Sequence, residues 1–206
     1  MRAAVVRDFN EDLSIETVKD PNCPVNGVVL EVAACGVCRS DFHGWVGGHP
    51  KVTNGSILGH EYCGTVVEAG AQAKHKVGDK LIAPFILGCG DCPACNAGHQ
   101  HVCHKLKFLG LDTDGAMQEI WTVPAHTLHV LPDDIAMDHA ALIEPVAVAC
   151  HDVRLSGLKA GEDVVVIGGG PIGILVAMVA RDAGGKVVLS EVNPNRLAIA
   201  EKLGFE

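Results

Sequence analysis

Several features that would point to other protein classes are absent from this 206-residue sequence. It has no cluster of five or more Lys or Arg residues, and its formal net charge is -9, which argues against a nucleic-acid-binding protein. It also lacks a run of about 18 apolar residues, and so we expect no membrane-spanning segment. The N-terminus, Met1–Arg7, has neither the basic nor the apolar region of a secretory signal. These absences lead us to expect a cytoplasmic protein.

Aromatic residues make up only 4% of the sequence, whereas apolar residues make up 48% and glycine occurs 24 times. From residue 1 to about 135, short apolar runs such as Ala3–Val6, Gly27–Ala33 and Gly64–Glu68 alternate with turn residues. Many short strands at close spacing predict a barrel-like or sandwich β-domain.

The pattern changes near Asp138, and we place a domain boundary near 150. A helix is expected to begin around Pro145. Beyond it the sequence alternates between strands and helices, which predicts a βαβ unit: Asp163–Ile167, Pro171–Ala183, Lys186–Glu191 and Asn195–Leu203. A Rossmann sheet has about six strands, and only two are visible here. The chain is therefore either a fragment or completed by a partner.

Four of the nine cysteines follow the spacing C-x2-C-x2-C-x7-C: Cys89, Cys92, Cys95 and Cys103. Glycines and a proline lie among them, so the segment is a loop that must fold around something. Four thiolates suit a closed tetrahedral zinc site, which stabilises structure and does not catalyse. Free or disulfide-bonded cysteines and an iron–sulfur cluster are the alternatives.

A thiolate, an imidazole and a carboxylate can hold a catalytic zinc with one position open, and Cys38, His60 and Glu144 are candidates. They are far apart in the sequence, so spacing alone does not establish the site. Cys150 is a rival for the third ligand. Cys35 and Cys38 also form a C-x-x-C, but Cys35 ends an apolar run and we expect it to pack in the core.

A glycine-rich loop, G-x-G-x-x-G, follows the expected strand at 163–167 and opens the next helix. Its key residues are Gly168, Gly170, Pro171, Ile172 and Gly173. In this context the loop predicts binding of a dinucleotide pyrophosphate at the helix N-terminus. Glu191 ends the second strand, where an acid binds a ribose 2′-hydroxyl and favours NAD over NADP. Arg196 lies nearby and leaves NADP open as the alternative.

The order of these motifs resembles that of the zinc-containing medium-chain alcohol dehydrogenases. The resemblance is carried by CGVCRSD at 35–41, GHEYCGTVVEAGAQA at 59–73, the four-cysteine loop, LIEP at 142–145 and the glycine loop. It implies a GroES-like β-barrel catalytic domain over 1–150, followed by the first half of a Rossmann fold over 151–206.

The resemblance also implies roles for individual residues. It makes Cys38 and His60 ligands of the catalytic zinc, and it places Glu144 at the position of the third protein ligand. An acid followed by Pro145 resembles the polyol and sugar dehydrogenase branch, in which Glu61 is a ligand or supports one. Asp41 would then orient the ring of His60.

By the same resemblance, Ser40 and His43 form a proton relay and Arg39 contacts the cofactor phosphate. The implied activity is hydride transfer between an alcohol or polyol and NAD, with two zinc ions per chain and a homo-oligomer at full length. The alternatives are a truncated, inactive zinc-stabilised module and a zinc-independent reductase of the same superfamily. Retention of the ligand residues opposes both.

Overall fold

The computed structural model describes residues Met1–Glu206, which divide into two compact units, Met1–Leu142 and Ile143–Glu206. The boundary that we expected near 150 falls inside helix α4, which runs without a break from Ile143 to Ser156. Pro145 lies in the first turn of α4, where its missing N–H removes no helical hydrogen bond.

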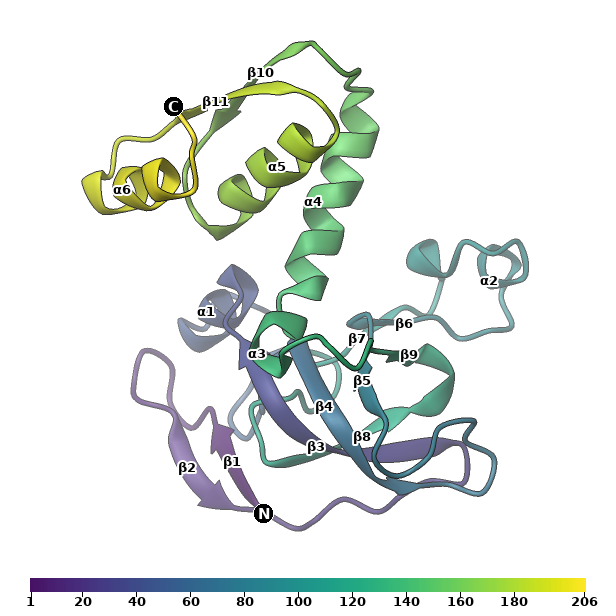
Figure 1. Ribbon diagram of the computed structural model, residues 1–206. Helices are drawn as coiled ribbons and strands as arrows, with labels where there is room; N and C mark the ends of the chain where they lie inside the picture. The colour runs from purple at the N-terminus through teal and green to yellow at the C-terminus, as the bar shows by residue number, and fades with distance from the viewer. The chain divides into compact units, whose positions relative to one another are not determined.

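The first unit is organised around a five-stranded antiparallel sheet with the order β8-β3-β4-β5-β9 (Figure 1). The strands are β3 (Gly27–Gly36), β4 (Glu61–Ala69), β5 (Lys80–Ile82), β8 (Ile120–Pro124) and β9 (His129–Val130). Strands β3 and β4 pair along most of their length, with register shifts after Val29 and Val32. The pairing ends at Gly36 opposite Glu61. This register brings the residues just after β3 next to the residues just before β4.

Shorter elements surround this sheet. Two further antiparallel pairs are β1 (Arg2–Val5) with β2 (Ser14–Thr17), and β6 (Ile86–Leu87) with β7 (Lys107–Phe108). The helices are α1 (Arg39–Trp45), α2 (Pro93–Asn96), η1 (Gln100–Val102), η2 (Ala125–Thr127) and α3 (Met137–Ala140). The strands thus form three separate sheets, and the main sheet does not close on itself.

The core of the first unit lies on one face of the main sheet. Side chains alternate along β8, so Trp121 and Val123 are buried while their neighbours are less so. They pack with residues of β3 and β4 such as Leu30, Tyr62 and Val66. The Tyr62 and Trp121 rings meet edge to face, with centroids 4.6 Å apart. Strands β3 and β4 therefore belong to a well-packed sheet.

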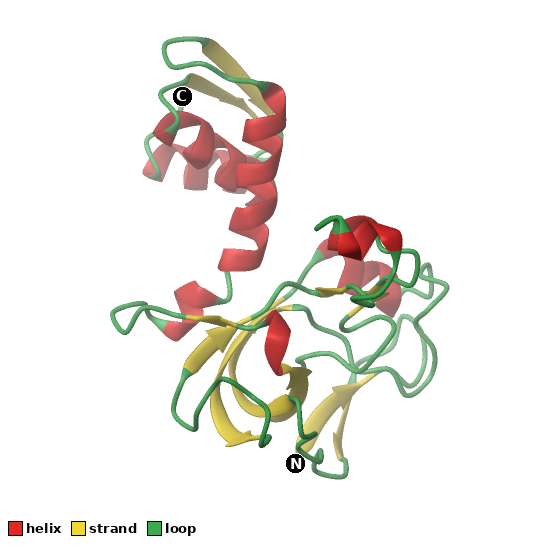
Figure 2. Cartoon of the chain, turned by 90° about the vertical axis from the view of Figure 1, so that its right-hand side faces the viewer, coloured by secondary structure: helices red, strands yellow, loops and turns green.

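The second unit contains the predicted βαβ arrangement. Its elements after α4 are β10 (Asp163–Ile167), α5 (Pro171–Asp182), β11 (Lys186–Ser190) and α6 (Pro194–Lys202), and β10 pairs with β11 in parallel. Helices α5 and α6 lie on one face of the two strands (Figure 2). Val166 and Leu189 are buried on that face, whereas Val165 and Val188 on the other face are exposed. None of the helices in the chain has the length and apolar character needed to cross a membrane.

Candidate metal centres and cofactor-binding loop

The four-cysteine segment folds into a compact loop between β6 and β7. Cys92 precedes the single turn of α2, and Pro93 begins that turn. Gly90 and Gly98 have positive φ angles of 80° and 82°, a conformation that glycine adopts without strain, and they turn the chain around the sulfurs. The four Sγ atoms of Cys89, Cys92, Cys95 and Cys103 all lie within 4.8 Å of one another.

The spacing of these sulfurs fits a single tetrahedral metal ion. Zn–S bonds of about 2.3 Å place tetrahedral sulfurs roughly 3.8 Å apart, and the Cys92 and Cys103 Sγ atoms are 3.8 Å apart. A disulfide would require about 2.05 Å, and all four cysteines are free. The residues present therefore fit the expected four-thiolate zinc site.

Backbone N–H groups point at the sulfurs and favour their ionised form. The N–H groups of Cys89 and Lys105 donate to Cys103 Sγ over 3.3 and 3.2 Å. The N–H of Cys95, together with that of His104, lowers the pKa of Cys92 to about 6. A hydrogen bond with Asp91 raises the pKa of Cys89 to about 12, and the pKa of Cys95 is raised as well. The backbone therefore favours the metal-binding thiolate at Cys92 and Cys103, and a bound cation would favour it at all four sulfurs.

A second cluster forms where β3 ends and β4 begins. The ligand atoms of Cys38, His60 and Glu61 lie within 4.8 Å of one another. Asp41 holds the cluster together, because its Oδ2 accepts the Cys38 N–H at 2.8 Å and its Oδ1 accepts the Gly59 N–H at 3.1 Å. Asp41 and His60 are each only 3% exposed. One buried carboxylate thus fixes the backbone on both sides of the site.

The ring of His60 is oriented by groups on both sides. Its Nδ1 lies 3.4 Å from Asp41 Oδ1, without an aligned hydrogen bond, and its Nε2 lies 3.4 Å from Ser40 Oγ. Burial lowers the pKa of His60, but Asp41 and Cys38 outweigh burial and raise it to about 10. The hydrogen bond with His60 lowers the pKa of Cys38 despite partial burial. A thiolate and an imidazole side by side are a suitable pair of zinc ligands.

Glu61 is part of the cluster because Gly36 leaves room for it. A Cβ atom at position 36 would overlap Glu61 Oε2. Glu61 is 8% exposed, and burial raises the pKa of its carboxyl group. Sequence reasoning assigned Glu61 only through family resemblance, and the structure places it beside Cys38 and His60.

The other residues expected at this site lie as follows. Ser40 and His43 are both on α1; Ser40 is close to His60, and His43 is exposed in the last turn. Arg39, also on α1, stacks over the Phe42 ring at 4.7 Å. Glu144 and its rival Cys150 are on α4 in the second unit, and their roles as ligands remain predictions. Burial raises the pKa of Cys35 to about 12, as expected for a packed thiol and unlike a redox-active one.

Two aromatic rings, those of Phe85 and Phe108, form a row that begins at the His60 ring. The Phe85 ring lies 5.2 Å from the His60 ring, and the Phe108 ring stacks on Phe85 at 5.5 Å. Pairing of β6 with β7 and the hydrogen bond from Leu109 N–H to the Phe85 carbonyl hold this pair. Nothing in the sequence pattern indicated Phe108.

The glycine loop has the geometry expected for a cofactor-binding turn. Gly168 has φ of 102°, and Gly170 precedes α5 with Pro171 in its first turn. A Cβ atom at Gly173 would overlap the Gly168 carbonyl, so α5 approaches the loop closely. A groove of about 460 Å³ runs along the loop and the first turn of α5. The free N–H groups at this helix end can bind an anion.

Glu191 follows β11 and is tied to the same loop. Its carboxylate accepts N–H groups of Asn193 at 2.8 Å, Gly169 at 2.8 Å and Val192 at 2.7 Å, and these bonds lower its pKa. Arg196 Nη1 lies 3.7 Å from Glu191 Oε2. Glu191 and Arg196, which the sequence suggested for cofactor binding, therefore both lie beside the glycine loop.

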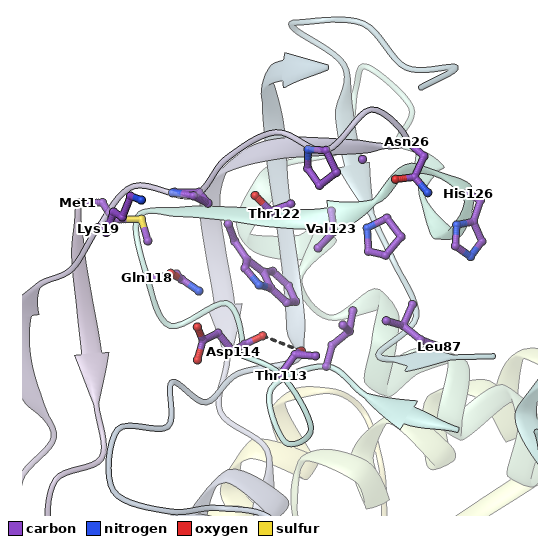
Figure 3. Close-up of a pocket in the computed structure, with 16 residues that line it drawn as sticks. Met1, Lys19, Asn26, Leu87, Thr113, Asp114, Gln118, Thr122, Val123 and His126 are labelled. Atoms are coloured by element: carbon purple, nitrogen blue, oxygen red, sulfur yellow. Dashed lines mark hydrogen bonds between the residues drawn. The ribbon is translucent and has the colours of Figure 1, made fainter. Parts of the chain in front are cut away.

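A separate cavity of about 560 Å³ lies in the first unit near β8 (Figure 3). Leu87, Trp121 and Val123 are apolar residues of its lining. Asp114 and Gln118 lie at one end (Figure 3). Burial raises the pKa of Asp114. None of the metal-cluster residues lines this cavity, and so it is distinct from the site described above.

Comparisons with known proteins agree with this arrangement. Residues 25–133 match the family described as the alcohol dehydrogenase GroES-like domain. The chain is 46% identical over 181 residues to 2-dehydro-3-deoxy-L-galactonate 5-dehydrogenase of Pseudoalteromonas atlantica, covering 87% of this chain and 53% of that protein. It is 36% identical to L-threonine 3-dehydrogenase of Rhizobium rhizogenes, covering 100% and 61%.

Solved structures show the same similarity. A zinc-binding dehydrogenase from Sinorhizobium meliloti bound to NADP is 35% identical, with a TM-score of 0.92 over 99% of this chain and 60% of that one. Galactitol-1-phosphate dehydrogenase from Escherichia coli is 27% identical, with a TM-score of 0.91 over 100% and 60%. The chain therefore spans about half to three fifths of the length of these proteins.

Proposed function

Because the chain belongs to the zinc-type medium-chain alcohol and polyol dehydrogenase family, we propose that it provides the metal site and part of the cofactor site of an enzyme that transfers hydride between an alcohol or polyol and a nicotinamide cofactor. The observation that carries this proposal is the cluster of Cys38, His60 and Glu61, whose ligand atoms lie within 4.8 Å of one another. Similarity to galactonate and threonine dehydrogenases supports a hydroxylated, polar substrate.

We assign Cys38 and His60 as ligands of the catalytic zinc, with Glu144 as the third ligand and Glu61 beside them. A zinc ion held there supplies Lewis acidity, which lowers the pKa of a hydroxyl group that it binds. Asp41 keeps Cys38 and His60 in place through its two backbone hydrogen bonds. The four cysteines of the 89–103 loop hold a second, structural zinc.

The proton released from the substrate hydroxyl needs a path out of a buried site. Ser40 Oγ, which lies 3.4 Å from His60 Nε2, is placed to accept it while passing its own hydroxyl proton onward. His43 lies on the same helix and is exposed, so it can pass the proton to water. Arg39, exposed at the start of α1, would bind a cofactor phosphate.

We propose that the second unit is the first half of a Rossmann domain and that the first unit forms a GroES-like barrel in the complete fold. The parallel pair β10–β11 joined by α5, with the glycine loop between β10 and α5, supports the first assignment. Glu191 would bind the ribose hydroxyls of NAD, and Arg196 beside it leaves NADP as the alternative.

A second candidate function is a zinc-stabilised module that folds without catalysing a reaction. The observation in its favour is the four-cysteine loop, whose Sγ atoms lie within 4.8 Å of one another and suit a closed site that stabilises structure without catalysing. Both candidates require the structural zinc, but only the enzyme requires the cluster at Cys38 and His60 to hold a metal and the glycine loop to bind a nucleotide.

The test is to measure zinc per chain, NAD and NADP binding by calorimetry, and alcohol and polyol oxidation. We expect two zinc ions per chain, one lost in Cys38→Ser and the other lost in Cys95→Ser. Cys150→Ser, an exposed thiol on α4, is the matched control and also tests the rival ligand. One zinc in the wild type, unaffected by Cys38→Ser, would refute the assignment of the catalytic site. Two zinc ions without nucleotide binding or turnover would indicate a fragment of the enzyme, whereas a single zinc held by the four-cysteine loop would favour the non-catalytic module.

A further inference from the structure

A row of neighbouring ring side chains leads from the catalytic cluster to a charged pair. The row runs from His60 to Phe85 and then to Phe108, with ring centroids 5.2 and 5.5 Å apart. Lys51 Nζ lies 4.9 Å from the centre of the Phe108 ring. Each step is within contact distance, so Lys51 lies at the outer end of the aromatic wall that begins at the zinc ligand.

Asp112 holds the Lys51 ammonium group in this position. Lys51 Nζ donates to Asp112 Oδ2 at 2.7 Å, and the same oxygen accepts the Phe108 N–H at 2.7 Å. Burial raises the pKa of Asp112, but Lys51 and the Phe108 N–H together lower it below its ordinary value. The carboxylate therefore stays ionised and connects the lysine directly to the backbone of the aromatic row.

The segments that carry Lys51 and Asp112 are anchored to the same small core. Val52, next to Lys51, is buried with Val6 and Leu58, and Leu111, next to Asp112, packs against this group. Because Leu58 lies just before Gly59 and His60, the core that fixes the charged pair also supports the metal cluster. Lys51 and Asp112 thus lie in turns whose neighbouring residues, Val52 and Leu111, are anchored in this core.

Both groups retain hydrogen-bonding capacity. An ammonium group has three N–H donors, and the only hydrogen bond of Lys51 Nζ within the chain is the one to Asp112. Asp112 Oδ1 accepts no hydrogen bond. The Lys51 side chain is 39% exposed and that of Asp112 is 22% exposed. A donor and an acceptor therefore face solvent side by side.

We propose that Lys51 and Asp112 form a specificity pair that binds two neighbouring hydroxyl groups of a polyhydroxylated substrate, at the end remote from the carbon that is oxidised. This inference rests on the proposed function, because it takes the reacting hydroxyl to lie at the Cys38–His60 cluster. Lys51 donates to one hydroxyl oxygen and Asp112 accepts the proton of the next, while the Phe85 and Phe108 side chains offer apolar contacts to the carbon chain. A monohydroxylated alcohol would make only the apolar contacts.

The alternative is that Lys51 and Asp112 form a surface ion pair without a ligand. Such pairs contribute little to stability, and a purely structural pair would affect every substrate equally. Comparing a polyol with a simple alcohol separates the two roles.

The experiment measures binding of sorbitol and of butan-2-ol to the zinc-loaded chain by saturation-transfer NMR, in the wild type and in Lys51→Met and Asp112→Asn. Lys107→Met is the matched control. Lys107 is an exposed lysine of β7, and its charge helps to lower the pKa of Asp112. Losing a hydrogen bond to a charged group should raise the sorbitol Kd roughly tenfold in each variant. The butan-2-ol Kd should stay within about twofold of the wild-type value, and Lys107→Met should change neither.

Two results would overturn the specificity pair while leaving the proposed function intact: unchanged sorbitol binding in both variants, or an equal loss for sorbitol and butan-2-ol. If the zinc-loaded wild type binds neither compound, the proposed function fails and the inference fails with it. Urea unfolding of each variant shows whether a loss of binding comes from a loss of structure.

Discussion

Replacing Tyr62 with phenylalanine should make the first unit more stable, which is unusual for a change at a buried core position. Tyr62 is 2% exposed, and its hydroxyl group has no hydrogen-bond partner. A buried polar group without a partner has lost its hydrogen bonds to water and gained none in return. Phenylalanine keeps the ring and its edge-to-face contact with Trp121 but removes the unsatisfied group.

The size of the effect follows from two opposing terms. Leaving a buried hydroxyl unsatisfied costs about 1–3 kcal/mol, which the substitution recovers. Removing one oxygen atom leaves a void of roughly 15 Å³, half the share of a water molecule, which costs about 0.4 kcal/mol. The expected net gain is about 0.5–2.5 kcal/mol, and it should raise Tm by about 2–4 °C for each kcal/mol.

Tryptophan fluorescence is the suitable assay. The chain has two tryptophans, Trp45 and Trp121, and both lie in the first unit. Urea unfolding followed at these residues therefore reports on the unit that contains Tyr62. Leu30→Ala, in the same core, is the control that shows the assay responds to core packing, and it should destabilise the unit by about 2–5 kcal/mol.

A Tyr62→Phe variant with equal or lower stability than the wild type would refute the reasoning. That result would mean that the hydroxyl group is hydrogen-bonded in solution, or that packing of the core depends on the volume that this hydroxyl group fills. Because the chain has a single tyrosine, absorbance near 295 nm during an alkaline titration checks independently that the hydroxyl group is shielded.

The metal sites give further predictions. Cys95→Ser should remove one zinc per chain and make the 89–103 loop sensitive to protease, which metal analysis and limited proteolysis would test. Asp41→Ala should weaken zinc binding at the catalytic cluster about 10- to 100-fold, measured by competition with a chelator; an unchanged affinity would show that Asp41 does not position the ligands. Gly36→Ala should displace Glu61 and change the spectrum of a cobalt-substituted site, whereas an identical spectrum would place Glu61 away from the metal. In the metal-stripped chain the pKa of His60 is raised from 6.5 to about 10, so its stabilising contribution is complete below about pH 6.5 and is lost as pH rises toward 10. Urea midpoints should decline over this range in the wild type but not in His60→Gln.

Much of the architecture could be predicted because its signals are local. The apolar run at 163–167, the glycines after it and Pro171 each act within a few residues, and the structure has the strand, turn and helix at those positions. The predicted boundary near 150 was less accurate, because nothing between Pro145 and Ser156 interrupts the helix. A change in composition locates the start of a new unit only approximately. Whether a helix continues depends on each residue in it, and no residue of α4 ends the helix before Ser156.

The four-cysteine site was also accessible from the sequence, since its ligands lie within one short loop that can fold around one ion by itself. The catalytic cluster was not accessible from spacing, because Cys38 and His60 meet only through the antiparallel register of β3 and β4. Family resemblance supplied those residues, and the structure then brought Cys38, His60 and Glu61 together.

What the sequence by itself determined was the set of elements and the kind of chemistry: short β-strands, a βαβ unit, four thiolates in one loop, and a glycine turn before a helix. Only the tertiary structure decided that Asp41 would bind backbone on both sides of the site, and that Phe108, Lys51 and Asp112 would continue the wall beyond Phe85. The physical reason is distance along the chain. Periodicity and turn chemistry act between neighbouring residues, whereas these contacts join segments that lie side by side only after the sheet has paired and the core of Val6, Val52 and Leu58 has packed.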